Sequence, residues 1–133
     1  MGVAEMNKRA ALSEFFSGFG IPSYVSTSVP ENAPFPRLTY DPVFNSFDFT
    51  GSNSGEVSVA VNLWYRSESE SIPNAKAQEI SDDIGIGGKI IPCDEGYIWV
   101  KRGSPFCQAL SDPDDTTIKR RYLNVTIEYL TAN

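Results

Sequence analysis

The residue types that carry chemistry are few in this chain, and their spacing matches no catalytic motif. There is no histidine, which removes Ser-His-Asp triads, Cys-His dyads and histidine-based metal sites. The two cysteines, Cys93 and Cys107, are too few for a disulfide framework, and we expect two reduced, partly buried thiols. We therefore expect a protein that is not an enzyme and holds no cofactor and no metal ion.

Two acidic groups and one glycine-rich segment are the remaining candidates for a ligand site. Asp82-Asp83 and residues 112–115 offer carboxylates, but their spacing fits no EF-hand loop, and a solvated helix end and loop explain them better. Residues 85–88 follow a helical pattern and precede a strand, whereas phosphate loops run from strand into helix. We interpret them as a helix terminus. Two carboxylates that meet only in space, as in glycosidases, stay open as an alternative.

The main basic cluster is Lys119-Arg120-Arg121. Alternate residues of a strand face opposite sides, so these three do not form one patch. They indicate either an ion pair at a subunit interface, a contact with an acidic partner, or an exposed strand start. Aromatic residues on predicted strands favour core packing or a protein interface over stacking of single-stranded nucleic acid, for which surrounding positive charge is missing. They are Trp64, Tyr65, Tyr97, Trp99 and Tyr122.

Length and charge limit the class of protein. The chain has 133 residues, of which 41% are apolar, as expected for a single folded domain over residues 1–133. Seventeen acidic residues against eleven basic ones give a net charge of −6, which argues against a general nucleic-acid binder and against adhesion to anionic membranes. No apolar run reaches the roughly 20 residues of a membrane span. Residues 1–5 precede a second methionine, Met6, and are either an added leader, a natural one or a disordered start.

Apolar periodicity predicts two helices. The first covers about residues 6–19 and the second about residues 72–84, and each carries one apolar stripe. The stripes consist of Leu12, Phe15, Phe16 and Phe19 in the first helix, and of Ile72, Ala75, Ala77, Ile80 and Ile84 in the second. Glycines follow both segments and end them.

Alternating apolar and polar residues predict strands through the rest of the chain. The alternation is clearest over residues 57–65, with Val57, Val59, Val61, Leu63 and Tyr65 on one side. In the last strand it places Leu123, Val125, Ile127 and Tyr129 on the inner face. The strands cover residues 21–25, 37–40, 43–50, 57–65, 89–92, 97–102, 106–110 and 118–131, and residues 51–55 and 103–105 are turns. The order is αβββαβββ or close to it. We expect an α+β fold, a mostly antiparallel β-sheet with two helices.

Several segments together resemble the minor tail proteins of long-tailed bacteriophages, in particular the tail-terminator or tail-completion group. The resemblance lies in the order of the elements: a helix, a proline-rich stretch, strands, a second helix, strands and a long final strand. It spans most of the chain from Ile21 onward. The segments that carry it are Pro34-Phe-Pro-Arg-Leu-Thr-Tyr40, Val59-Ala-Val-Asn-Leu-Trp-Tyr-Arg66, Gly87-Gly-Lys-Ile-Ile91, Gly96-Tyr-Ile-Trp-Val-Lys-Arg-Gly-Ser-Pro-Phe106 and Arg121-Tyr-Leu-Asn-Val-Thr-Ile-Glu-Tyr129.

The resemblance implies a structural virion protein. Such proteins form a ring of their own copies, usually a hexamer, at the head-proximal end of the tail tube. The ring stops tube polymerisation and provides the head-joining surface. The implied partners are the tail tube protein and a head-completion or connector protein, with DNA only as passing lumen content, in the virion tail and in the host cytoplasm during assembly. Another head–tail joining or minor structural protein, and a non-phage protein-binding adaptor module, are the alternatives.

A ring needs heterologous contacts, in which one patch meets a different patch on the neighbour. The proline-rich arm, residues 26–36, and residues 45–55 are natural candidates, and we expect the arm to be mobile in the monomer and fixed by a neighbour. The candidate subunit-interface residues are Pro30, Pro34, Phe35, Arg37, Phe47, Lys119, Arg120 and Arg121.

Overall fold

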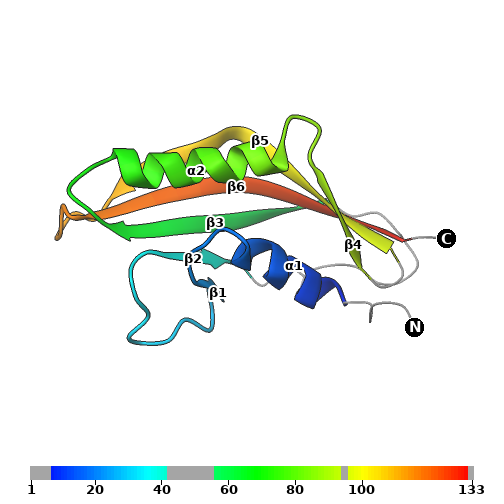
Figure 1. Cartoon of the computed structure of the whole chain (residues 1–133), viewed down its shortest axis with the longest axis horizontal. Coiled ribbons are helices and arrows are strands. Elements are labelled where there is room, and N and C mark those ends of the chain that lie inside the picture. Colours follow the sequence, from blue (N-terminus) through cyan, green and yellow to red (C-terminus); the bar gives the residue numbers. More distant parts are fainter. Residues whose placement is uncertain (1–6, 42–55, 94–95, 132–133) are drawn as a thin grey trace.

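The computed structural model describes residues 7–41, 56–93 and 96–131. They form two helices and a curled, mostly antiparallel six-stranded sheet, which confirms the α+β class (Figure 1). In chain order the elements are α1 (Lys8–Ser17), β1 (Ser23–Val25), β2 (Arg37–Tyr40), β3 (Glu56–Arg66), α2 (Ser71–Ile84), β4 (Lys89–Cys93), β5 (Gly96–Ser111) and β6 (Ile118–Thr131).

The spatial order of the strands is β1-β2-β3-β6-β5-β4. The short edge strand β1 runs parallel to β2, and every other neighbouring pair is antiparallel. The last strand of the chain, β6, lies between β3 and β5 and pairs with both along most of its length. It is therefore hydrogen-bonded along both edges and lies at the centre of the sheet.

Both helices pack on the same face of the sheet and share its hydrophobic core. In α1, Phe16 is fully buried and its ring stacks on that of Tyr40, with the centroids 4.5 Å apart. In α2, Ala77, Ile80 and Ile84 face the sheet. The predicted inner face of β6 is confirmed, because Leu123, Val125, Ile127 and Tyr129 are buried. Their neighbours in β6 are partly exposed on the opposite, helix-free side.

The helices differ from the predicted ones in their ends and in one stripe. The first begins at Lys8, where Asn7 accepts a hydrogen bond from the Ala10 amide, and ends at Ser17. The predicted stripe of α2 was wrong at its start, because Ile72 is 55% exposed and Ala75 is exposed as well. The buried face instead contains Pro73, Ala77, Ile80, Ser81 and Ile84. These residues recur every three or four positions, so they share one side of the helix, and Ile72 and Ala75 fall outside it.

The turn predicted at residues 103–105 was also wrong, because β5 continues through it. The long strand β6 pairs with β5 on both sides of this point, with Arg102 opposite Val125 and Cys107 opposite Leu123. The extra residues of β5 form a β-bulge, so a single bulged strand replaces the predicted pair. Gly103 permits this bulge, because a Cβ atom there would lie 3.0 Å from the backbone oxygen of Asn124.

The predicted strand at 43–50 and the turn at 51–55 lie outside the described residues. Among the residues that are described, no helix is both long and apolar enough to cross a membrane.

Candidate functional site

The helix-free face of the sheet carries a row of basic and aromatic side chains at one end. Arg37 in β2, Trp64 in β3 and Arg120 in β6 are direct partners in the strand register. Directly opposite residues on neighbouring strands project on the same side, so these three lie next to one another across the sheet. The register of the central strands thus positions this row.

Phe35 and Arg66 extend the row into a continuous arrangement, which we call the basic stack (Phe35, Arg37, Trp64, Arg66 and Arg120). The Arg37 guanidinium lies 4.6 Å from the Phe35 ring centroid and 5.6 Å from that of Trp64. Arg120 lies 4.9 Å from the Trp64 ring, and Arg66 lies 4.9 Å from the Phe35 ring. All four distances are within the range of cation–π attraction, about 6 Å. Cations and rings therefore alternate through the stack.

Hydrogen bonds from the same face fix these side chains. The Trp64 indole N–H donates to Oγ1 of Thr39 at 3.0 Å, and Nε of Arg120 donates to Oδ1 of Asn62 at 2.8 Å. Nη1 of Arg37 donates to the Ala33 carbonyl oxygen at 3.2 Å, which ties the base of the arm to the stack. The buried Nε of Arg37 has no hydrogen-bond partner among the described residues. A buried donor without a partner is unfavourable, and a further acceptor would relieve it.

The acidic loop between β5 and β6 holds the outer end of the stack. Asp115 accepts a hydrogen bond from Arg66 at 2.9 Å and others from the backbone N–H and hydroxyl of Thr117. These donors, with those of Thr117 first, lower the pKa of Asp115 from 3.8 to about 2. One of the acidic residues that the sequence offered as a metal ligand is thus engaged in positioning an arginine.

Arg37 and Arg120 form no ion pair with any carboxylate of the described residues. Both are partly exposed, as are Phe35 and Trp64. Trp and Arg are the residue types most enriched at the energetic centres of protein interfaces. Guanidinium groups already lie over both rings, which leaves less ring surface for a nucleic-acid base. The arrangement therefore suits an acidic protein partner better than single-stranded nucleic acid.

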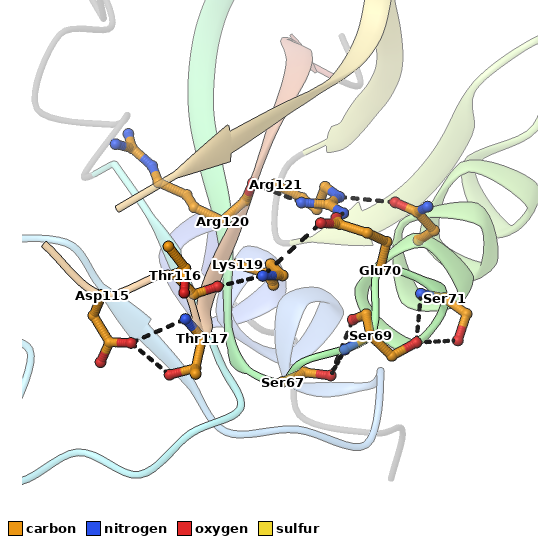
Figure 2. A network of polar contacts seen from close by, with 11 residues as sticks. Ser67, Ser69, Glu70, Ser71, Asp115, Thr116, Thr117, Lys119, Arg120 and Arg121 are labelled. Atoms are coloured by element: carbon orange, nitrogen blue, oxygen red, sulfur yellow. Dashed lines mark hydrogen bonds and ion pairs between the residues drawn. The ribbon is translucent and has the colours of Figure 1, made fainter. Parts of the chain in front are cut away.

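The residue next to Arg120 has a different role. Arg121 is 1% exposed and lies on the helix side of β6. It donates to Oδ1 of Asn74 at 2.8 Å, to the Arg120 carbonyl oxygen, and to Oε1 of Glu70, the N-cap residue of α2 (Figure 2). Nζ of Lys119 lies 3.9 Å from the other oxygen of Glu70. This network attaches the start of α2 to β6.

The structure separates the predicted interface residues into two groups. Arg120 and Arg121 point in opposite directions from β6 (Figure 2), as the alternation of a strand requires. Phe35, Arg37 and Arg120 meet in the basic stack, and the arm with Pro30 and Pro34 adjoins it. Arg121 and Lys119 are instead engaged with Glu70 inside the chain. Phe47 lies outside the described residues.

Two members of the stack, Trp64 and Arg66, were not among the candidate subunit-interface residues, although Trp64 was named among the aromatic residues expected in the core or at a protein interface. Trp64 occupies a polar-side position of the clearest alternating strand, and an exposed tryptophan at such a position is a signal that could have been used. No signal in the sequence links Arg66 to Phe35, because their contact depends on the path of the arm.

The described part of the chain contains no cluster of three or more His, Cys, Asp or Glu residues that could hold a metal ion. No protein-family model and no curated protein sequence matches this chain.

Proposed function

We propose that this protein is a structural virion protein of a long-tailed bacteriophage. In this proposal its copies form a ring at the head-proximal end of the tail tube, which terminates tube polymerisation and provides the surface for head joining. The role requires no catalysis and no cofactor. It requires subunit contacts made by surfaces outside the core.

The observation that carries the proposal is the basic stack on the helix-free face of the sheet. It brings two aromatic rings and three guanidinium groups together beside a projecting arm. Aromatic residues and arginine are enriched at protein interfaces. Their clustering on this face is therefore more typical of a subunit interface than of a surface that contacts only water. The order of elements, αβββαβββ, is the one on which the resemblance to tail terminators rests.

The same stack also suits a non-phage adaptor that binds an acidic protein. The two roles differ in what the protein does to a growing polymer: a terminator must assemble on a tube end and stop it, whereas an adaptor leaves the length of tubes unchanged.

Electron microscopy of the full chain separates these roles. The protein is imaged alone and after mixing with polymerising tube subunits encoded in the same genome. We expect rings at one end of the tubes and a shorter mean tube length. Bare tube ends and an unchanged length distribution, with a protein that stays monomeric at every concentration, would contradict the proposal.

A further inference from the structure

A groove with a volume of about 940 Å³ is lined by residues of α1, the C-terminal half of α2 and β4. Both helices cover the side of the sheet opposite the basic stack (Figure 1). Its apolar wall includes Ala11, Phe15, Phe19 and Ile91. Ile90 also lines the groove and is 50% exposed. Exposed apolar surface of this kind, with polar residues around it, is typical of a binding site.

The rim of the groove is negatively charged. Four carboxylates line it, from Glu14 in α1 and from Glu79, Asp82 and Asp83 in α2, against the single ammonium group of Lys89. Lys89 pairs with Asp83 at 2.9 Å, and Glu79 pairs with Lys76. No described cation pairs with Glu14 or Asp82. The chemistry of the groove therefore suits an occupant that is apolar or aromatic and positively charged.

The basic stack has this chemistry. It presents the guanidinium groups of Arg37 and Arg120, which lack carboxylate partners among the described residues, beside Phe35 and Trp64. The stack lies on the helix-free face at the end of the sheet where β3 ends and β6 begins, whereas α1 and β4 lie toward the other end (Figure 1). One molecule thus carries two complementary surfaces that cannot meet within it.

We propose that the groove receives the basic stack and the adjoining arm, residues 26–36, of a second copy of the chain. This inference rests on the proposed ring function and names its subunit contact. Two different patches on opposite faces make a heterologous interface, which closes into a ring when the rotation between copies permits. Complementary charge fixes which patch meets which.

Charge-reversal variants of the full chain test this contact. Glu14→Lys with Asp82→Lys reverses the unpaired rim charges of the groove, and Arg120→Glu reverses the centre of the stack. Each variant alone is expected to weaken self-association about 10- to 100-fold. Ile86→Lys is the control, because Ile86 is 98% exposed and lines neither surface. Circular dichroism and thermal melting check that each variant is folded.

Mixing the two variants gives the sharper result. Each variant retains one intact surface, and the two reversed surfaces again carry opposite charge, so a groove variant and a stack variant should associate in alternation. Native mass spectrometry should show mixed oligomers with equal numbers of the two variants, which neither variant forms alone. Rings formed by either variant as readily as by the unmodified chain would overturn the assignment of these surfaces while leaving the proposed ring function standing.

A cross-linking measurement covers weak association. One chain carries Glu31→Cys in the arm with Cys93→Ser and Cys107→Ser, and the other carries only Cys107→Ser, so its single thiol is Cys93 in the groove wall. A short bismaleimide should join residue 31 of one chain to Cys93 of the other. A chain with Ile86→Cys in place of Glu31→Cys is the control and should not be joined. Absence of the 31–93 product would overturn the proposal.

The same variants distinguish a second copy from the tube subunit as occupant. If the groove variant self-associates normally but no longer caps tubes, the groove binds the tube, and the contact proposed between copies is wrong. If the unmodified chain neither associates nor caps tubes, the proposed function itself fails.

Discussion

Arg121 is almost completely buried, yet its guanidinium pairs with Glu70, whose side chain is 61% exposed. The pair joins the beginning of α2 to the central strand β6. Water reaches the carboxylate of Glu70 but not the guanidinium of Arg121. Removal of one partner therefore has a different effect on stability from removal of the other. Loss of Glu70 leaves a buried cation with only Asn74 and a carbonyl oxygen as acceptors.

Glu70→Ala should therefore lower the free energy of unfolding by about 1–3 kcal/mol, below the ~3–5 kcal/mol typical of a fully buried pair, because Glu70 is hydrated. Urea unfolding at pH 7 measures it. Lys119→Met is the matched control, because it keeps the apolar stem of a side chain that is 12% exposed and removes only an ammonium group 3.9 Å from Glu70. It should cost less stability than Glu70→Ala. Equal losses in the two variants would contradict a special role for the buried arginine.

Gly103→Ala should destabilise the fold by about 1–3 kcal/mol, the usual cost of inserting a methyl group where no space exists. The added Cβ would lie 2.5 Å from the Asn124 side chain and 3.0 Å from its backbone oxygen. Gly87→Ala is the control, since nothing lies within 4 Å of a Cβ there. Thermal unfolding of both variants checks the difference. An unchanged melting temperature for Gly103→Ala would mean that the bulge of β5 is not tightly packed against β6.

Asp115 should contribute to stability in a pH-dependent way. Its pKa falls from 3.8 to about 2 on folding, because Thr117 and Arg66 donate hydrogen bonds to the ionised form. A lowered folded-state pKa stabilises the fold above the unfolded value, and this stabilisation is lost as the pH falls from about 4 to about 2. Asp115→Asn should thus melt at a lower temperature than the unmodified chain at pH 7, and the gap should close toward pH 2. A gap that stays constant over this range would contradict the assignment.

Cys107 should react slowly with alkylating reagents. Burial raises the pKa of its thiol, and the positive charge of Arg121 offsets this only in part. The thiolate is the reactive form, so a raised pKa lowers the rate at neutral pH. In the Cys93→Ser variant, Cys107 is the only thiol, and iodoacetamide should modify it more slowly at pH 8 in the folded state than in urea. Equal rates in both conditions would indicate an accessible, unperturbed thiol.

The α+β class could be predicted because helical periodicity and strand alternation are patterns among residues close in sequence. The alternation in β3 and β6 identified the buried side of each strand correctly, and glycine at the end of α2 marked its terminus. The bulged strand β5 was missed, since Gly103 and Pro105 look like a turn unless the length of β6 beside them is known. At Gly103 and Pro105, pairing with β6 outweighs the local preference of glycine and proline for turns.

The candidate site was accessible from the sequence only in part. Phe35, Arg37 and Arg120 were named as interface residues, but their meeting around Trp64 depends on the register of β2, β3 and β6. The groove could not be expected from any motif, because its wall combines α1, α2 and β4. Long-range packing, which no local pattern encodes, produces both surfaces.

Tail length in a phage that lacks this protein tests the central claim most directly. Electron micrographs of lysates from the deletion phage should show tubes of uncontrolled length that are not attached to filled heads, and supplying the chain in trans should restore both properties. Tails of normal length, joined to heads in the absence of the protein, would contradict the account.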